Sequence, residues 1–72
     1  MDKERLQQFG EGIRQLRRSK NLTQAELASR MGRDQQSIQR LESGRVNPTY
    51  LYLLELAKSL EMDISELVAV GK

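Results

Sequence analysis

Apolar residues recur at intervals of three and four positions along this 72-residue chain, and that spacing is typical of one face of an α-helix. The first such stripe, which predicts a helix over about residues 2–19, consists of Leu6, Phe9, Ile13 and Leu16. One Phe, two Tyr and no Trp leave the core to aliphatic side chains, which suit helices better than a sheet. The pattern therefore predicts an all-α fold.

Capping and turn residues divide the rest of the chain into further short helices. Thr23 and Glu26 have the spacing of a capping box, and Asp34 is a good N-cap. Gly32 and Gly44 stand where a left-handed residue commonly ends a helix. These signals predict a second helix over about residues 24–31 and a third over residues 35–43.

The last two helices have start signals of their own. Asn47 is expected to cap a fourth helix, to about residue 60, with Pro48 at its first position. Asp63 and Glu66 give a weaker signal for a short fifth helix that ends near residue 68. The apolar side of the fourth helix is predicted to consist of Leu51, Leu54, Ala57 and Leu60. We expect a compact five-helix bundle that forms a single domain over residues 1–72, frayed at its last two residues.

Composition argues against several classes of function. The chain has no Cys and no His, so disulfides, thiolate metal sites and the commonest general base are missing. A charged start and the lack of a long apolar run predict neither a secretion signal nor a membrane span. We expect a cytoplasmic protein that is not an enzyme and has no cofactor, metal, small-molecule ligand or membrane partner.

The charges are distributed unevenly. Residues 1–24 carry six basic and three acidic side chains (+3), residues 25–45 four and three (+1), and residues 46–72 two and four (−2). A polyanion that meets the N-terminal two-thirds would suit this asymmetry, and ordinary solvated helix faces would explain it equally well. RNA is disfavoured because the polar faces lack aromatic side chains on which bases could stack.

The second and third helices have the steric features of a helix-turn-helix between Gln24 and Ser43. Ala28 is small where two such helices cross, and Gly32 lies four residues later in the tight turn. Ile38 and Leu41 would bury the inner face of the third helix. Each feature is common in helical hairpins, and their combination at these spacings predicts the motif.

The outer face of the third helix is polar and contains little charge. Glutamine can pair with adenine through two hydrogen bonds, and arginine can pair with guanine or contact a phosphate. This face therefore predicts base reading in the major groove, with an uncharged surface helix as the alternative. Its side chains are Gln35, Gln36, Gln39, Arg40 and Ser43.

The segments 22–28, 35–38, 41–44 and 47–48 together resemble the Cro/cI-type (Xre-like) helix-turn-helix family of phage repressors and bacterial transcription regulators, over roughly residues 13–67. The resemblance implies the lambda-repressor-like fold and binding to double-stranded DNA. It implies that Gln35, Gln36 and Arg40 face bases, with Gln39 beside them. It implies phosphate contacts for Thr23, Gln24, Arg17, Ser43, Arg45 and Asn47.

The resemblance also implies an ion pair between Arg17 and Glu42, although these could instead be independent surface charges. Two features depart from a similar phage repressor. Arg40 replaces a glutamine, so the base read there should differ, and the loop 45–47 is a residue shorter and less basic. Arg30 and Arg33 could supply the missing phosphate contacts or could be solvated charges.

One recognition helix reads only a few base pairs, so the family solution is a two-fold dimer on a pseudo-palindromic operator. Candidate dimer contacts are Leu67, Val68, Val70 and Ile64, with Tyr50 or Tyr52 as additions, although Ile64 and Leu67 could complete the core instead. An antitoxin-type or other protein-interaction module of the same fold is the alternative function. A large exposed apolar patch outside a dimer contact would favour it.

Overall fold

Every helix in the computed structural model, which describes residues 2–70, begins at a side chain that accepts a hydrogen bond from the backbone of the first turn. These caps satisfy amides that have no acceptor inside the helix. The caps are Asp2, Thr23, Asp34, Thr49 and Asp63. The helices are α1 (Lys3–Ser19), α2 (Gln24–Arg30), α3 (Gln35–Glu42), α4 (Tyr50–Ser59) and α5 (Ile64–Val68).

The helices α1 to α4 each end in the same type of turn. The second residue after each helix has a positive φ: 58° at Asn21, 66° at Gly32, 74° at Gly44 and 56° at Glu61. At the end of α2, for example, the amide of Arg33 donates to the carbonyl of Ala28 over 2.9 Å. This Schellman arrangement closes the helix and reverses the chain within a few residues. The two glycine ends predicted from the sequence are confirmed.

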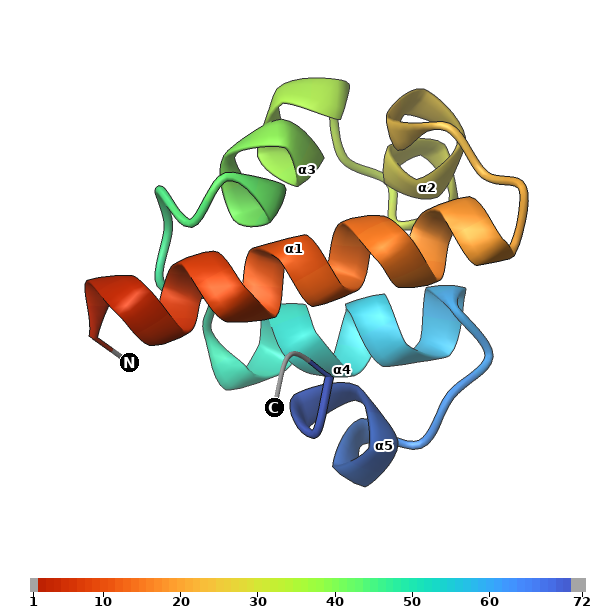
Figure 1. Cartoon of the computed structure of the whole chain (residues 1–72). Helices are drawn as coiled ribbons and strands as arrows, with labels where there is room; N and C mark the ends of the chain where they lie inside the picture. Colours follow the sequence, from red (N-terminus) through yellow and green to blue (C-terminus); the bar gives the residue numbers. More distant parts are fainter. Residues whose placement is uncertain (1, 71–72) are drawn as a thin grey trace.

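The helix α1 runs between the pair α2–α3 and the pair α4–α5 (Figure 1). Contacts join α2 to α3, α1 to α3 and α4 to α5. The all-α prediction is confirmed, and no helix among residues 2–70 is long and apolar enough to cross a membrane. The expectation for the last two residues lies outside the described range. The core consists of Phe9, Ile13, Leu22, Leu27, Ala28, Ile38, Leu41, Tyr52, Leu56, Ala57, Leu60 and Leu67.

The predicted start of α4 is wrong. Thr49, and not Asn47, caps the helix, because its hydroxyl accepts from the amide of Tyr52 over 3.1 Å. Pro48 therefore precedes the cap and lies outside the helix. Both Asn and Thr are effective caps, so the sequence offers two starts and the packing of Tyr52 selects the later one.

The predicted apolar side of α4 is wrong in its first half. Leu51 is 63% exposed and Leu54 is 37% exposed, whereas Tyr52 and Leu56 face the core. Nearly every residue at the start of α4 is apolar, so two stripes fit the helical spacing equally well. The contacts with α3 and α5, which the sequence does not reveal, decide between them.

A glycine allows α1 to approach the end of α3 closely. A Cβ atom at Gly10 would lie 2.5 Å from the carbonyl oxygen of Leu41 and 2.6 Å from that of Glu42. These atoms belong to the backbone, so they cannot turn aside as a flexible side chain would. Gly10 thus sets the distance between α1 and the C-terminal end of α3.

We predict that Gly10→Ala destabilises the protein by about 1–3 kcal/mol, the usual cost of overpacking. Alanine is the better helix former by roughly 0.5–1 kcal/mol, and the clash outweighs this gain. Chemical denaturation measures the change, with Gln15→Ala at an exposed position of α1 as the control. An alanine variant as stable as the wild type would show that α1 and α3 can separate freely.

Candidate nucleic-acid interface

Small and aliphatic side chains of α2 and α3 pack the two helices against each other on either side of the turn that joins them. Ala28 of α2 and the pair Ile38 and Leu41 of α3 are at most 1% exposed. Gly32 has the positive φ that the turn requires. The inner face of α3 is therefore buried, and the orientation of its outer face is fixed.

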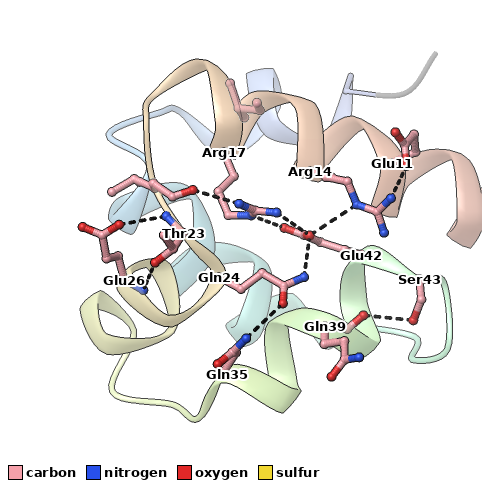
Figure 2. Close-up of polar contacts among 12 residues, drawn as sticks. Glu11, Arg14, Arg17, Thr23, Gln24, Glu26, Gln35, Gln39, Glu42 and Ser43 are labelled. Atoms are coloured by element: carbon pink, nitrogen blue, oxygen red, sulfur yellow. Dashed lines mark hydrogen bonds and ion pairs between the residues drawn. The ribbon is translucent and has the colours of Figure 1, made fainter.

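The outer face of α3 presents the four side chains predicted to read bases. Gln35, Gln36, Gln39 and Arg40 are all exposed. Figure 2 shows Gln35 and Gln39 on the side of α3 that faces away from α1. The arrangement offers amide donors and acceptors beside a guanidinium, which are the groups that match base edges in the major groove.

Ser43 ends this face but uses its hydroxyl locally. Its Oγ donates to the carbonyl of Gln39 over 2.9 Å and lies 3.2 Å from the carbonyl of Arg40. The hydroxyl is therefore engaged with its own helix in this conformation. Arg45 and Asn47, in the loop between α3 and α4, are both exposed, and they are better placed than Ser43 to meet a phosphate.

The start of α2 contains the predicted capping box. The amide of Glu26 donates to Oγ1 of Thr23 over 3.0 Å, and the amide of Thr23 donates to the Glu26 carboxylate over 2.9 Å. The pKa of Glu26 is lowered, mainly by the hydrogen bond with the backbone of Thr23 and to a smaller extent by the hydrogen bond with the Thr23 side chain. The hydroxyl proton of Thr23 remains able to donate to a phosphate, although the charge of Glu26 already occupies this helix end.

Behind the outer face, the Glu42 carboxylate joins α1, α2 and α3 (Figure 2). Nε and Nη2 of Arg17 donate to it over 2.6 and 3.0 Å, and Nε2 of Gln24 donates over 3.0 Å. Nε of Arg14 lies 3.6 Å away. Arg17 also donates through Nη1 to the carbonyl of Leu22, which precedes α2. The predicted pair of Arg17 and Glu42 is thus present and buried.

The second role predicted for Arg17, a phosphate contact, stays a prediction, and the burial of the side chain argues against it. The residue is only 6% exposed, and all three of its guanidinium nitrogens donate within the protein. Sequence spacing placed Arg17 near the end of α1 but did not reveal its burial. Arg14, which lies three residues earlier on the same helix, was missed, although helical spacing puts it beside Arg17.

Burial alone would raise the pKa of Glu42, but the hydrogen bond from Arg17 opposes it. The hydrogen bond from Gln24 and the charges of Arg17 and Arg14 act in the same direction as the Arg17 hydrogen bond, and the net result is a lowered pKa. The hydrogen bond to Glu42 likewise raises the pKa of Arg17. Both groups are therefore charged across the physiological range.

The two arginines whose role was left open both contact α4. Arg33 donates to Glu55 over 2.9 and 3.2 Å and lies 4.5 Å from the centre of the Tyr52 ring. Nη1 of Arg30 donates to the carbonyl of Ser59 over 3.2 Å. Tyr52 also contacts α3, because its hydroxyl lies 3.1 Å from Oγ of Ser37. These contacts support the reading of both arginines as surface charges.

Part of the predicted dimer surface lies inside the protein. Leu67 is completely buried, so its prediction as a contact with a second subunit is wrong. Tyr52, considered as an addition, is only 9% exposed. Val70 and Ile64 pack partly against the core, whereas Val68 is 47% exposed. Leu67 belongs to the core, and Ile64 and Val70 pack against it, so of this segment Val68 is the side chain most available to a second subunit.

A family model described as Helix-turn-helix matches residues 13–67. This chain belongs to the Cro/cI-type helix-turn-helix family. A relative from Sinorhizobium fredii, the uncharacterized HTH-type transcriptional regulator y4dJ, is 48% identical over 59 residues, which are 82% of this chain and 77% of the relative. Members of this Cro/cI-type family are DNA-binding regulators rather than enzymes.

Solved structures agree with the Cro/cI-type fold. The restriction-modification controller protein C.AhdI from Aeromonas hydrophila is 35% identical, with a TM-score of 0.82 over 86% of this chain and 94% of its own. The clp gene regulator ClgR from Corynebacterium glutamicum has a TM-score of 0.84 over 90% of this chain and 83% of its own. At 22% identity, ClgR supports the fold alone.

We predict that Glu42→Gln destabilises this Cro/cI-type protein by about 3 kcal/mol at neutral pH, because the charge of buried Arg17 loses its partner. The lowered pKa of Glu42 means that the carboxylate stabilises the fold fully above its ordinary value of 4.5. That stabilisation is lost as the pH falls through the lower pKa of the folded state.

The difference in free energy of unfolding between the wild type and Glu42→Gln should therefore become smaller as the pH drops below about 4.5. Urea denaturation across the acid range measures it. Glu26 and Asp63, whose pKa values are also lowered, are common to both proteins and cancel in the comparison. A difference that does not change with pH would contradict the ionised state of Glu42.

Proposed function

We propose that this protein is a sequence-specific, double-stranded DNA-binding transcription regulator that inserts α3 into the major groove and acts as a repressor. The observation that carries this proposal is the exposed row of Gln35, Gln36, Gln39 and Arg40 on a helix whose opposite face is buried. A helix fixed in this way presents its side chains to base edges with little loss of conformational freedom. The DNA of the cell is its partner, so the protein would act in the cytoplasm.

The side chains of α3 favour particular bases. The amides of Gln35 and Gln36 match the N7 acceptor and N6 donor of adenine, and Arg40 matches the two acceptors of guanine. Gln39 lies beside them and completes the face. The operator half-site should therefore combine A·T pairs near the N-terminal end of α3 with a G·C pair near Arg40.

Groups on both sides of α3 would hold the DNA backbone. On one side are Thr23 and Gln24 at the start of α2, and on the other are Arg45 and Asn47 in the loop that follows α3. Arg45 supplies a full positive charge, whereas the others donate neutral hydrogen bonds. Such contacts position the helix without reading sequence.

A second copy of the chain would double the length of DNA that is read. The exposed apolar side chains of α4 and α5 supply a surface for it: Tyr50 (68% exposed), Leu51 (63%), Leu54 (37%) and Val68 (47%). We propose that this set, in place of buried Leu67, forms the contact of a two-fold dimer on half-sites about one helical turn apart.

An antitoxin-type module that masks another protein is the second candidate function. The exposed apolar surface of α4 and α5 favours it only where that surface lies outside a dimer contact. A charge on this surface that leaves dimerisation unchanged would therefore favour the module.

Selection of bound duplexes from a random DNA pool tests the main proposal. A pseudo-palindromic consensus is expected. Gln36→Ala should then lose about 1–3 kcal/mol on the selected site and little on random DNA, because it removes a base contact. Arg45→Ala should weaken binding to all sequences and reduce the salt slope by about one unit. A pool that stays random would contradict the proposal, and equal losses on both DNAs would remove Gln36 from the base-reading set.

We also predict that Leu51→Asp weakens dimerisation at least about tenfold, because it places a charge in the proposed apolar contact. Leu51 is mostly exposed, so the fold should be unaffected. Sedimentation equilibrium measures the dimer constant, and Gln8→Asp on α1 adds the same charge elsewhere as a control. If the two variants dimerise equally well, the α4 surface is not the contact.

A further inference from the structure

The side chain of Tyr52 connects α4 to the first turn of α3. Its hydroxyl lies 3.1 Å from Oγ of Ser37, a half-buried residue of that turn. The guanidinium of Arg33, in the connection between α2 and α3, is 4.5 Å from the centre of the Tyr52 ring. Arg33 also donates to Glu55 of α4 over 2.9 and 3.2 Å. We call these four side chains the α3–α4 bridge.

The α3–α4 bridge joins two helices that belong to different parts of the bundle. The most extensive backbone contacts join α2 to α3, α1 to α3 and α4 to α5, and α1 runs between the two pairs (Figure 1). Tyr52 is only 9% exposed, and a buried tyrosine hydroxyl usually needs a hydrogen-bond partner. A movement of α3 relative to α4 would separate this hydroxyl from Ser37, and it would therefore cost the free energy of that hydrogen bond.

Another side of α4 contains the proposed dimer contact. Tyr52 and Glu55 are three residues apart, so they lie on one face of the helix. Leu51 and Leu54, also three residues apart, are 63% and 37% exposed on a neighbouring face. The helix α4 therefore has the α3–α4 bridge on one face and an exposed apolar contact on the next.

The distance between the two copies of α3 in a dimer has to match the distance between the two half-sites. One additional base pair moves the half-sites apart by about 3.4 Å and rotates one relative to the other by about 34°. A dimer in which α3 can shift relative to α4 would adapt to such a change. A dimer in which α3 is fixed to α4 would bind the altered operator more weakly.

We propose that the α3–α4 bridge fixes the separation of the two recognition helices in the dimer, and thereby the half-site spacing that the protein binds. Tyr52 and Arg33 are positioning residues in this proposal, because they act through the placement of α3. The inference rests on the proposed function and on the proposed dimer contact of α4. It assigns to these side chains a choice between operators that differ in spacing and have identical half-sites.

Tyr52→Phe provides the main test, because it removes the hydroxyl and keeps the ring in the core beside Arg33. Affinities are measured for duplexes that hold the two selected half-sites at the selected spacing, one base pair closer and one base pair farther apart. The wild type should bind the selected spacing best. In Tyr52→Phe the ratio of affinities for selected and altered spacings should fall about fivefold, the usual effect of one neutral hydrogen bond on an equilibrium. Discrimination against base changes within a half-site should stay as in the wild type.

Three further variants show whether the effect passes through the α3–α4 bridge. Ser37→Ala removes the other partner of the same hydrogen bond, so combining it with Tyr52→Phe should reduce the spacing preference no further. Arg33→Met removes the guanidinium from Tyr52 and Glu55, and it should also reduce the preference. Arg30→Met is the matched control, because it removes the same charge and a different contact between α2 and α4. Its spacing preference should equal that of the wild type.

Several results would overturn the inference and leave the proposed function standing. They are a wild type that binds all three spacings equally, a spacing preference that Tyr52→Phe leaves unchanged, and a preference that Arg30→Met reduces as much as Arg33→Met. A dimer constant that Leu51→Asp does not change would overturn it too, because α4 would then hold no dimer contact. A random DNA pool that yields no consensus would defeat the proposed function together with this inference.

Discussion

The buried pair of Arg17 and Glu42 is the interaction on which the rest of the structure depends. It joins the last turn of α1 to the last residue of α3, and the third nitrogen of Arg17 holds the backbone that leads into α2. A buried pair of this kind contributes little net stability compared with apolar packing, but losing one partner is costly. Its value here is geometric, because it fixes three helix ends relative to one another. The position of the outer face of α3 follows from those three ends and from the close approach that Gly10 permits.

Features that depend on neighbouring residues could be predicted from the sequence. The capping box at Thr23, the cap at Asp34 and the glycine ends at Gly32 and Gly44 are all decided within one helical turn. The outer face of α3 could also be predicted, since the helical period and two inward-facing residues determine it. The family resemblance pointed to Glu42 as the partner of Arg17, a contact between residues 25 positions apart. Local spacing alone would not have paired them.

Features that depend on packing could not be predicted. The start of α4 offered two caps and two apolar stripes, and contacts with distant residues, among them those of Tyr52 with Arg33 and Ser37, select the stripe that contains Tyr52. Leu67 has the apolar side chain that a dimer contact needs, and only its complete burial in the folded bundle shows that it is a core residue. Gln24 was expected to meet a phosphate, and no spacing rule could show that its amide also lies between Glu42 and Gln35.

The separation of the two faces of α3 has a consequence for how such proteins diverge. Among residues 2–70, the side chains of Gln36, Gln39 and Arg40 make no hydrogen bond or ion pair to the rest of the protein, whereas Ile38, Leu41 and Glu42 hold the helix in place. Under the proposed function, gene duplication followed by substitution at the three outer positions would produce paralogues with different DNA targets at little cost in folding stability. Cross-talk between such copies in one genome would be avoided by changes that leave the scaffold untouched. Gln35 is the exception, since its hydrogen bond to Gln24 couples any change there to the interior.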